Sequence, residues 1–372
     1  MLRATLVFPL GLAACSMGLE YQSVFPDETW PTLAHSHVDD TKISVLVIGG
    51  PGCTSGGDCN GDHERVAASA YDLCQREGCD FGLFLGDHFV PGTANGNTNV
   101  DTVKHRRWET MFEEHYRAFG ALQDFQFWGA FGEHDYSHGN RLQTQVQYSV
   151  AEDYNSDGLW LLPDRHYGIP NLPEFVQIEM VDTVVITCGW EGAAGVDQVE
   201  SIASAFADSP AVWRIVAGHH PAMSIGDRTD RAIDKRPGGK VKPDLDEARD
   251  VCRMRDAANQ WRQGGMNLLL SAHEHNQQIL EAKGYVQVIS GSASQVADDI
   301  DDDERAQAGV VDAHARAGFA IVTLTATNAT VELYGDGGSQ LSSATWTAEE
   351  VEALEAYRDA LVCDEVAVDC EL

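Results

Sequence analysis

The chain contains few basic residues. Its 25 lysines and arginines face 58 aspartates and glutamates, so the formal net charge of the 372 residues is −33 at pH 7. Nucleic acids and anionic lipid surfaces require a basic face, and this balance argues against both as partners. Hydrophobic residues nevertheless make up 43% of the chain. This fraction predicts a folded core under an acidic surface, with room for two domains or one large α/β domain.

The apolar run near the amino terminus is too short to cross a bilayer. It covers Ala4–Ala14 and is typical of the core of a signal peptide, which we predict for residues 1–14. The adjoining tetrad Leu12-Ala13-Ala14-Cys15 resembles a bacterial lipobox, in which the cysteine carries the lipid; ordinary cleavage after small residues is the alternative. We expect an exported protein that is lipid-anchored at Cys15 in a bacterial cell envelope, at the outer membrane and facing the periplasm or the surface. Residues 15–41 would form a polar arm, and contact with the membrane would be through the lipid alone.

The nine cysteines become an even set once Cys15 is assigned to the lipid. Eight cysteines in an exported protein predict up to four disulfides, although 105 pairings are possible. The spacings favour three local bonds: Cys53–Cys59, Cys74–Cys79 and Cys363–Cys370. A cysteine-ligated zinc site is the alternative, but the sequence contains no CxxC pair.

Short apolar, β-rich runs alternate with segments of helical periodicity. The predicted strands are Ile43–Ile48, Phe81–Leu85, Phe125–Phe131, Thr183–Cys188, Trp213–Ala217, Met266–Ser271 and Tyr285–Ile289. The predicted helices are Glu64–Arg76, Val103–Phe119 and Ala248–Arg262. This order predicts mixed sheets with helices on their faces, an architecture in which ligands gather at the carboxyl ends of the strands.

Acidic residues and histidines follow four of these strands directly. The four motifs are Gly86-Asp87-His88, Gly132-Glu133-His134-Asp135, Gly218-His219-His220-Pro221 and Ala272-His273-Glu274-His275. A single histidine in such a place is more often a structural residue than a ligand. Four strand ends that deliver carboxylates and imidazoles to one sheet edge favour a divalent first-row metal site.

These motifs resemble those of the calcineurin-like metallophosphoesterases, in particular the small purple acid phosphatases, from about Ile43 to Val296. Further similar stretches are Arg107–Glu113, Trp160–Pro163 and Ser290–Ala293, and Cys188 and Cys252 stand where these enzymes have a disulfide. The resemblance implies an α+β fold, a four-layer α/β/β/α sandwich, over residues 42–340. It also implies hydrolysis of phosphomonoesters, so that a phosphorylated small molecule or a phosphoprotein is the expected substrate. A helix and a disulfide-clipped tail are expected over residues 341–372.

The ligand set that the resemblance implies is incomplete. Family members end the first strand in Gly-Asp, but this strand ends in Gly49-Gly50, and Val90 replaces the iron-binding tyrosine. The first metal position therefore retains Asp87 and His275 alone. The second position retains four donors, with a glutamate in place of the family's asparagine: Asp87, Glu133, His219 and His273. We predict one zinc, manganese or iron ion rather than two.

The resemblance places His134 at the catalytic histidine of the family and Arg228 near a second one. The alternative for His134 is a structural hydrogen bond to Asp135. The insert Cys53–His63 directly follows the missing aspartate, and its Asp58, Asp62 or His63 could replace the lost donor. The competing function is that of a pseudophosphatase serving as a binding or scaffolding module, as in a glideosome-associated anchor protein of apicomplexan parasites.

Two other motifs lie outside this set. Asp153, Asn155 and Asp157, with Asp164, have the spacing of a calcium loop, for which a solvated turn is the alternative. Thr347 and Glu350 predict a capping box that opens a helix reaching about Val362. The sequence leaves the oligomeric state open.

Overall fold

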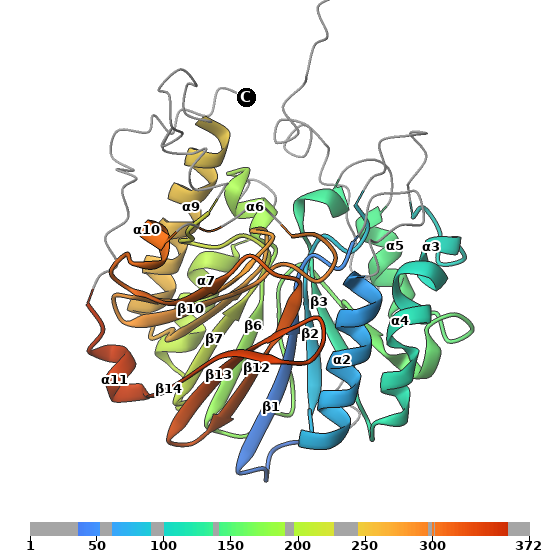
Figure 1. Ribbon diagram of the computed structural model, residues 1–372, viewed down its shortest axis with the longest axis horizontal. Helices are drawn as coiled ribbons and strands as arrows, with labels where there is room; N and C mark the ends of the chain where they lie inside the picture. The colour runs from blue at the N-terminus through green and yellow to red at the C-terminus, as the bar shows by residue number, and fades with distance from the viewer. Residues whose placement is uncertain are drawn as a thin grey trace, which may run out of the picture.

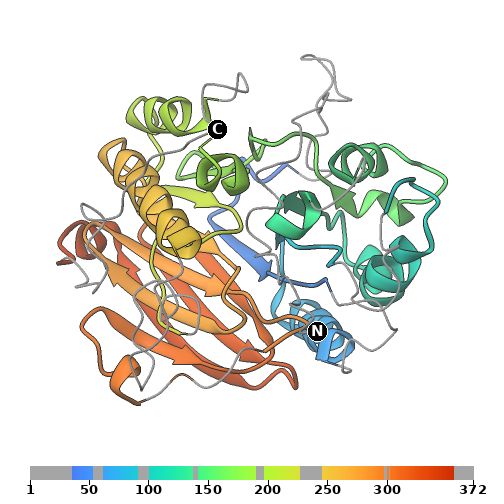
Figure 2. The same cartoon turned by 90° about the horizontal axis from the view of Figure 1, so that it is seen from above.

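Two seven-stranded sheets lie face to face, and helices cover their outer faces (Figures 1 and 2). The structure, a computed structural model, describes residues 36–52, 62–90, 100–136, 141–189, 197–226, 245–296, 300 and 302–355. The predicted four-layer α+β sandwich is confirmed. Within the described residues, no helix combines the length and the apolar character that crossing a bilayer requires.

The first sheet has the strand order β14-β13-β12-β1-β2-β3-β4. Neighbouring strands from β1 to β4 are parallel, and the remaining pairs are antiparallel. The bounds are β1 Lys42–Ile48, β2 Phe81–Leu85, β3 Phe127–Ala130, β4 Trp160–Leu161, β12 Gly318–Thr325, β13 Asn328–Gly335 and β14 Gln340–Thr347.

The second sheet has the order β11-β9-β10-β8-β7-β6-β5. Its four central strands are parallel, and β5, β9 and β11 are antiparallel to their neighbours. The bounds are β5 Tyr167–Gly168, β6 Val176–Met180, β7 Trp213–Ala217, β8 Leu268–Ser271, β9 Gln277–Ala282, β10 Tyr285–Ser290 and β11 Val310–His314.

The helices form the two outer layers. One group lies on the first sheet: α2 Asp62–Glu77, α3 Arg106–Trp108, the π-helix η1 Glu109–Glu113, α4 Glu114–Tyr116, the 3-10 helix η2 Arg117–Ala121 and α5 Arg141–Tyr148. The second sheet is covered by α6 Thr183–Thr187, α7 Gln198–Ala207 and α9 Leu245–Gln263. Short elements complete the chain: η3 Glu133–Tyr136, η4 Ser156–Gly158, α10 Asp302–Arg305 and α11 Ala348–Glu352.

Side-chain alternation along β1 shows why this strand is apolar throughout. Ile43, Val45 and Val47 belong to the core between the sheets. Leu46 and Ile48 point the other way and pack with residues of α2. Because a strand's side chains alternate between two faces, burial of both faces gives an unbroken apolar run.

One predicted strand, Thr183–Cys188, is wrong, because residues 183–187 form helix α6. β-Branched residues suggested a strand there, but Asp182 caps the helix by accepting a hydrogen bond from the amide of Val184 at 3.2 Å. The strand that pairs with β7 in the second sheet is β6 instead. At the other end of the chain, β14 extends the sheet past the predicted boundary at residue 340. The Thr347–Glu350 capping box then opens α11, which ends at Glu352 and not at about Val362 as predicted.

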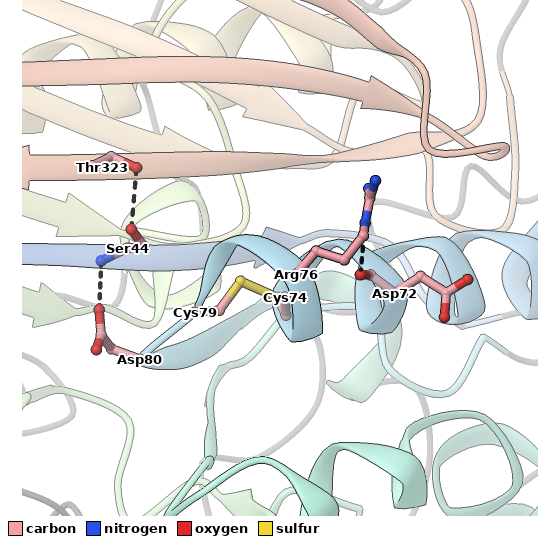
Figure 3. The surroundings of a disulfide bond; sticks show 7 residues. All are labelled: Ser44, Asp72, Cys74, Arg76, Cys79, Asp80 and Thr323. Carbon is pink, nitrogen blue, oxygen red and sulfur yellow. Dashed lines mark hydrogen bonds between the residues drawn. A yellow bond between two sulfur atoms is a disulfide. The ribbon is translucent and has the colours of Figure 1, made fainter.

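The Cys74–Cys79 disulfide is confirmed and joins the end of α2 to the turn before β2 (Figure 3). Next to it, the carboxylate of Asp80 accepts a hydrogen bond from the amide of Ser44 at 2.6 Å, which ties this turn to β1. Cys188 and Cys252 are also disulfide-bonded. The predicted pairs Cys53–Cys59 and Cys363–Cys370 and the predicted lipidation site Cys15 lie outside the described residues.

Candidate metal centre

Carboxylates and imidazoles meet at the carboxyl-terminal edge of both sheets. Asp87 and Glu133 follow β2 and β3, whereas His219 and His273 follow β7 and β8. Oδ2 of Asp87 lies 3.2 Å from Nε2 of His219, which lies 3.2 Å from Nδ1 of His273. That Nδ1 atom lies 3.1 Å from Oε2 of Glu133. Four of the five predicted metal ligands are thus neighbours in space.

Two of these residues have an unusual backbone conformation. Asp87 has φ 55° and His273 has φ 64°, in the left-handed region that residues other than glycine seldom adopt. Such a conformation costs on the order of 1 kcal/mol or more and persists where the surrounding structure imposes it. Left-handed residues at the ends of β2 and β8 point to a functional site rather than to an ordinary strand end.

Asp135 fixes the loops that carry the two carboxylates. Its fully buried carboxylate accepts hydrogen bonds from the amides of Asp87 and Gly132, both at 2.9 Å. It also accepts one from Nε2 of Gln145 at 2.9 Å. Gly132 has to be a glycine here, because a Cβ atom at that position would lie 2.4 Å from Oδ1 of Asp87.

The charge state of Asp87 depends on the histidines beside it. Burial alone would raise the pKa of this carboxyl group, but His219 and His134 outweigh that effect and hold the pKa well below its usual value. The amide of His134 adds a hydrogen bond to Oδ1 at 2.8 Å. Asp87 is therefore a carboxylate over the whole physiological pH range.

His220 is a member of this cluster that the sequence interpretation missed. Its Nε2 atom lies 3.2 Å from Oε2 of Glu133, and its Nδ1 atom lies 2.8 Å from the hydroxyl of Thr183. Burial and the nearby His273 lower the pKa of His220 to about 3, although Glu133 opposes this shift. The signal was the doublet His219-His220, of which only the first histidine was assigned to the site.

His134 stands at the rim of the cluster. Its side chain is 18% exposed, and Nε2 lies 3.9 Å from Asp87 and 3.8 Å from Glu133. This position, beside both carboxylates and open to solvent, suits a group that contacts a bound substrate. Asp135 instead bonds to the backbone around His134, through the amides of Asp87, His88 and Gly132.

The remaining predicted residues have different outcomes. His275 is partly buried two residues beyond His273, and it belongs to none of the metal-type clusters among the described residues. Arg228 lies outside the described residues. Asp62 pairs with Arg65, and His63 bonds to the hydroxyl of Tyr116 at 3.0 Å, so both side chains have other contacts. Asp58 also lies outside the described residues.

The position of the missing first-site aspartate is tightly packed. Gly50 has φ 57°, and a Cβ atom there would lie 2.9 Å from the carbonyl oxygen of Gly291. A Cβ atom at Gly49 would lie 2.3 Å from the carbonyl oxygen of Ser290. The hydroxyl of Ser294 donates to the carbonyl oxygens of Gly50 and Gly52 at 2.7 and 2.8 Å. This segment therefore has no room for an aspartate in its present conformation.

Helix α9 adds acidic groups next to His273 of the cluster. Oε2 of Glu247 lies 3.7 Å from Nε2 of His273. Burial raises the pKa of Asp250 to about 7; Arg249 opposes the shift, and Glu133 and Glu247 add to it. No sequence motif predicts this contribution, because the two acidic residues lie on a charged helix far from the four motifs.

Two other polar groups lie apart from this edge. His37 bonds to Asp40 at 2.6 Å and lies 3.8 Å from Asp80, at the amino-terminal ends of β1 and β2. In the predicted calcium loop, Oδ1 of Asn155 accepts a hydrogen bond from the amide of Trp160 at 2.9 Å. This oxygen already has a protein donor, which favours the turn interpretation.

The donor atoms of the cluster fit a divalent transition metal. Nδ1 of His219 lies 2.8 Å from the carbonyl oxygen of Leu85, which only accepts, so Nδ1 carries the proton. In neutral His219 the lone pair of Nε2 then faces the carboxylate of Asp87. Two lone pairs 3.2 Å apart require a cation between them, either a proton or a metal ion.

The structure is similar to several solved structures. GAP50 of Plasmodium, described as the anchor in the inner membrane complex, aligns with a TM-score of 0.64 and 15% identity over 83% of this chain and 89% of its own. A purple acid phosphatase from yellow lupin (Lupinus luteus) seeds aligns with a TM-score of 0.54 and 14% identity over 90% of this chain and 57% of its own. PhoD aligns with a TM-score of 0.55 and 12% identity over 85% of this chain and 70% of its own. No model of a protein family and no curated protein matches the sequence.

Proposed function

We propose that this chain, whose fold is that of the calcineurin-like metallophosphoesterases, hydrolyses phosphomonoesters at the carboxyl-terminal edge of its sheets. The observation that carries the proposal is the convergence of Asp87, Glu133, His219 and His273 from four separate strands. Carboxylates and imidazoles in one cluster are the ligands that divalent transition metals prefer.

Each residue has a role that its position supports. Asp87, Glu133, His219 and His273 would hold one ion, which when bound supplies a Lewis acid for a phosphoryl oxygen. His134, at the solvent-exposed rim, would hydrogen-bond the phosphate or donate a proton to the leaving oxygen. His275 and Arg228 stay predicted, as a further ligand and as a phosphate-binding group.

One ion rather than two is proposed, because the packing at Gly50 leaves the first metal position without its aspartate. Zinc, manganese or iron could occupy the remaining site. The expected substrates are phosphorylated small molecules or phosphoproteins. With a net charge of −33, the surface repels polyanions, so the local positive field of the ion and Arg228 would have to attract the phosphate.

The test compares the wild-type protein with His219→Ala and His134→Ala. Hydrolysis of p-nitrophenyl phosphate and of a bis-ester is measured with added zinc, manganese or iron. His219→Ala should reduce the rate to background, and His134→Ala should reduce it by roughly 100-fold or more, the usual contribution of a general acid. His166→Ala is the matched control, since His166 pairs with Glu179 at 3.2 Å and belongs to none of the metal-type clusters among the described residues. Equal rates in His219→Ala and wild type would contradict the enzymatic function.

A binding or scaffolding module is the second candidate function. Two observations favour it: the filled position at Gly50 and the similarity to GAP50, a protein described as an anchor. Absence of hydrolysis with every metal, together with retained folding, would support this function instead.

We also propose that the protein is exported and anchored in a bacterial envelope through a lipid on Cys15. The disulfide Cys74–Cys79 supports an oxidising compartment, since such bonds are rare in the cytosol. Mass analysis of the protein purified from its membrane fraction tests the anchor. A diacylated Cys15 at the amino terminus is expected, and an unmodified cysteine would exclude it.

A further inference from the structure

Three histidine rings gather around one carboxylate at the proposed metal site. The ring centroids of His219, His220 and His273 are 4.9, 5.1 and 4.4 Å apart in pairs. All three rings are buried, with 1, 3 and 7% of their surface exposed. One nitrogen of each ring and one oxygen of Glu133 lie within 4.8 Å of one another.

The inward-facing atoms have the spacing of ligands that share an ion. Nε2 of His220 lies 3.2 Å from Oε2 of Glu133, and Nδ1 of His273 lies 3.1 Å from the same oxygen. Nε2 of His219 lies 3.2 Å from that Nδ1. Two atoms bound to one zinc ion at its usual bond lengths are roughly 3.0–3.4 Å apart.

The outward-facing nitrogen of each ring has a separate partner. Nδ1 of His219 donates to the carbonyl oxygen of Leu85 at 2.8 Å. Nδ1 of His220 lies 2.8 Å from the hydroxyl of Thr183, and Nε2 of His273 lies 3.7 Å from Glu247. Metal-binding histidines characteristically have such a partner on the other ring nitrogen, which fixes the ring and its tautomer.

We propose that His220 is a metal ligand beside Glu133, His219 and His273, and that the site these residues form with Asp87 binds a zinc ion in preference to manganese. This inference rests on the metal centre of the proposed function and adds a third imidazole to it. Imidazole ligands suit zinc, whereas sites made of oxygen ligands suit manganese. His220 lies next to the start of α6, where Thr183 faces its Nδ1 atom.

The first experiment measures metal affinity, so it does not depend on catalysis. The chelator-treated full-length protein is titrated with Zn²⁺ and with Mn²⁺ by calorimetry, using a competing chelator for tight binding. His220→Gln should weaken zinc binding by about 100-fold, at the upper end of what loss of an outer partner costs, and should weaken manganese binding less. His166→Gln is the matched control and should bind as the wild type does.

A second pair of variants tests the positioning of His220 without altering the ring. Thr183→Val removes the hydroxyl that faces Nδ1 and keeps the shape of the side chain, whereas Thr183→Ser keeps the hydroxyl. Zinc affinity should fall by about 10-fold or more in Thr183→Val and should be close to wild type in Thr183→Ser. This pattern is not expected if His220 only bonds to Glu133 through a proton.

The outcomes separate this inference from the proposed function. Wild-type zinc affinity in both His220→Gln and Thr183→Val would overturn the assignment of His220 even if the protein hydrolyses phosphomonoesters. Loss of zinc affinity in these variants, with no hydrolysis by the wild type, would support the ligand and reject the enzyme. A wild-type protein that binds no zinc would overturn the inference directly. Circular dichroism of each variant without metal establishes that it is folded.

Discussion

The carboxylate of Asp135 accepts a hydrogen bond from the backbone amide of Asp87 at 2.9 Å, across 48 positions of the chain. The same carboxylate oxygen accepts a second hydrogen bond, from the backbone amide of Gly132 at 2.9 Å. Asp135 therefore fixes the ends of β2 and β3 relative to each other. The separation of Asp87 and Glu133, which the proposed metal site requires, depends on this buried group.

We expect Asp135→Asn to destabilise the protein and to weaken metal binding. The NH₂ group of the asparagine side chain would face N–H groups that now donate to the carboxylate. At least one buried N–H group would then lack an acceptor, at a cost of about 1–3 kcal/mol for each such group. A lower melting temperature and a zinc affinity reduced by about 10-fold or more are expected. Differential scanning calorimetry and metal titration measure the two effects. Asp302→Asn is the control, because the side chain of Asp302 is fully exposed. If both variants have the same melting temperature, Asp135 does not stabilise the loops after β2 and β3.

Restoring the aspartate of the resembling family should not restore a second metal ion. In Gly50→Asp, the left-handed backbone and the carbonyl oxygen of Gly291 at 2.9 Å oppose any side chain. We expect a loss of about 1–2 kcal/mol in the free energy of unfolding and an unchanged metal content. Gly50→Ala provides the same strain without the carboxylate. Two bound ions in Gly50→Asp at undiminished stability would show that the segment can open.

His63 should make the protein sensitive to acid. It is fully buried against Tyr116, and burial, with His115 nearby, holds its pKa well below the ordinary value. The unfolded chain therefore binds a proton near pH 6.5 that the folded chain does not bind, so stability falls as the pH decreases below that value. The slope reaches about 1.4 kcal/mol per pH unit. In His63→Phe, this part of the loss of stability at low pH should be absent.

The measurement for His63 is urea unfolding from pH 7.5 to pH 5. The difference between wild type and His63→Phe isolates this residue from the many carboxylates. His115 faces the ring of His63 at 4.3 Å and also has a lowered pKa, chiefly through burial, so His63→Phe with His115→Gln is the second variant. If the free energy of unfolding changes with pH in the same way in wild type and in His63→Phe, then protonation of His63 does not destabilise the folded protein.

Strand periodicity predicted six of the fourteen strands that the structure describes, β1, β2, β3, β7, β8 and β10, because strands buried on both faces leave unbroken apolar runs in the sequence. It failed at Thr183–Thr187, where the composition is that of a strand but the cap at Asp182 starts a helix. Four site residues could be predicted because each directly follows a strand. Glu247 could not, since its approach to His273 depends on how α9 packs rather than on any local motif.

Glu133 provides the most direct test of how this site differs from the resembling family, which has an asparagine there. Its Oε2 atom reaches both His220 and His273, and asparagine is one methylene shorter and uncharged. We expect Glu133→Gln to weaken zinc binding by about 10- to 100-fold through loss of charge, and Glu133→Asn to weaken it further through lost reach. Added zinc should raise the melting temperature of the wild type and have less effect on each variant, because an ion stabilises the fold only where it binds. Glu179→Gln, which removes the charge next to His166, is the control and should retain the full zinc effect. An asparagine variant that binds zinc as tightly as the wild type would show that the carboxylate is not a ligand.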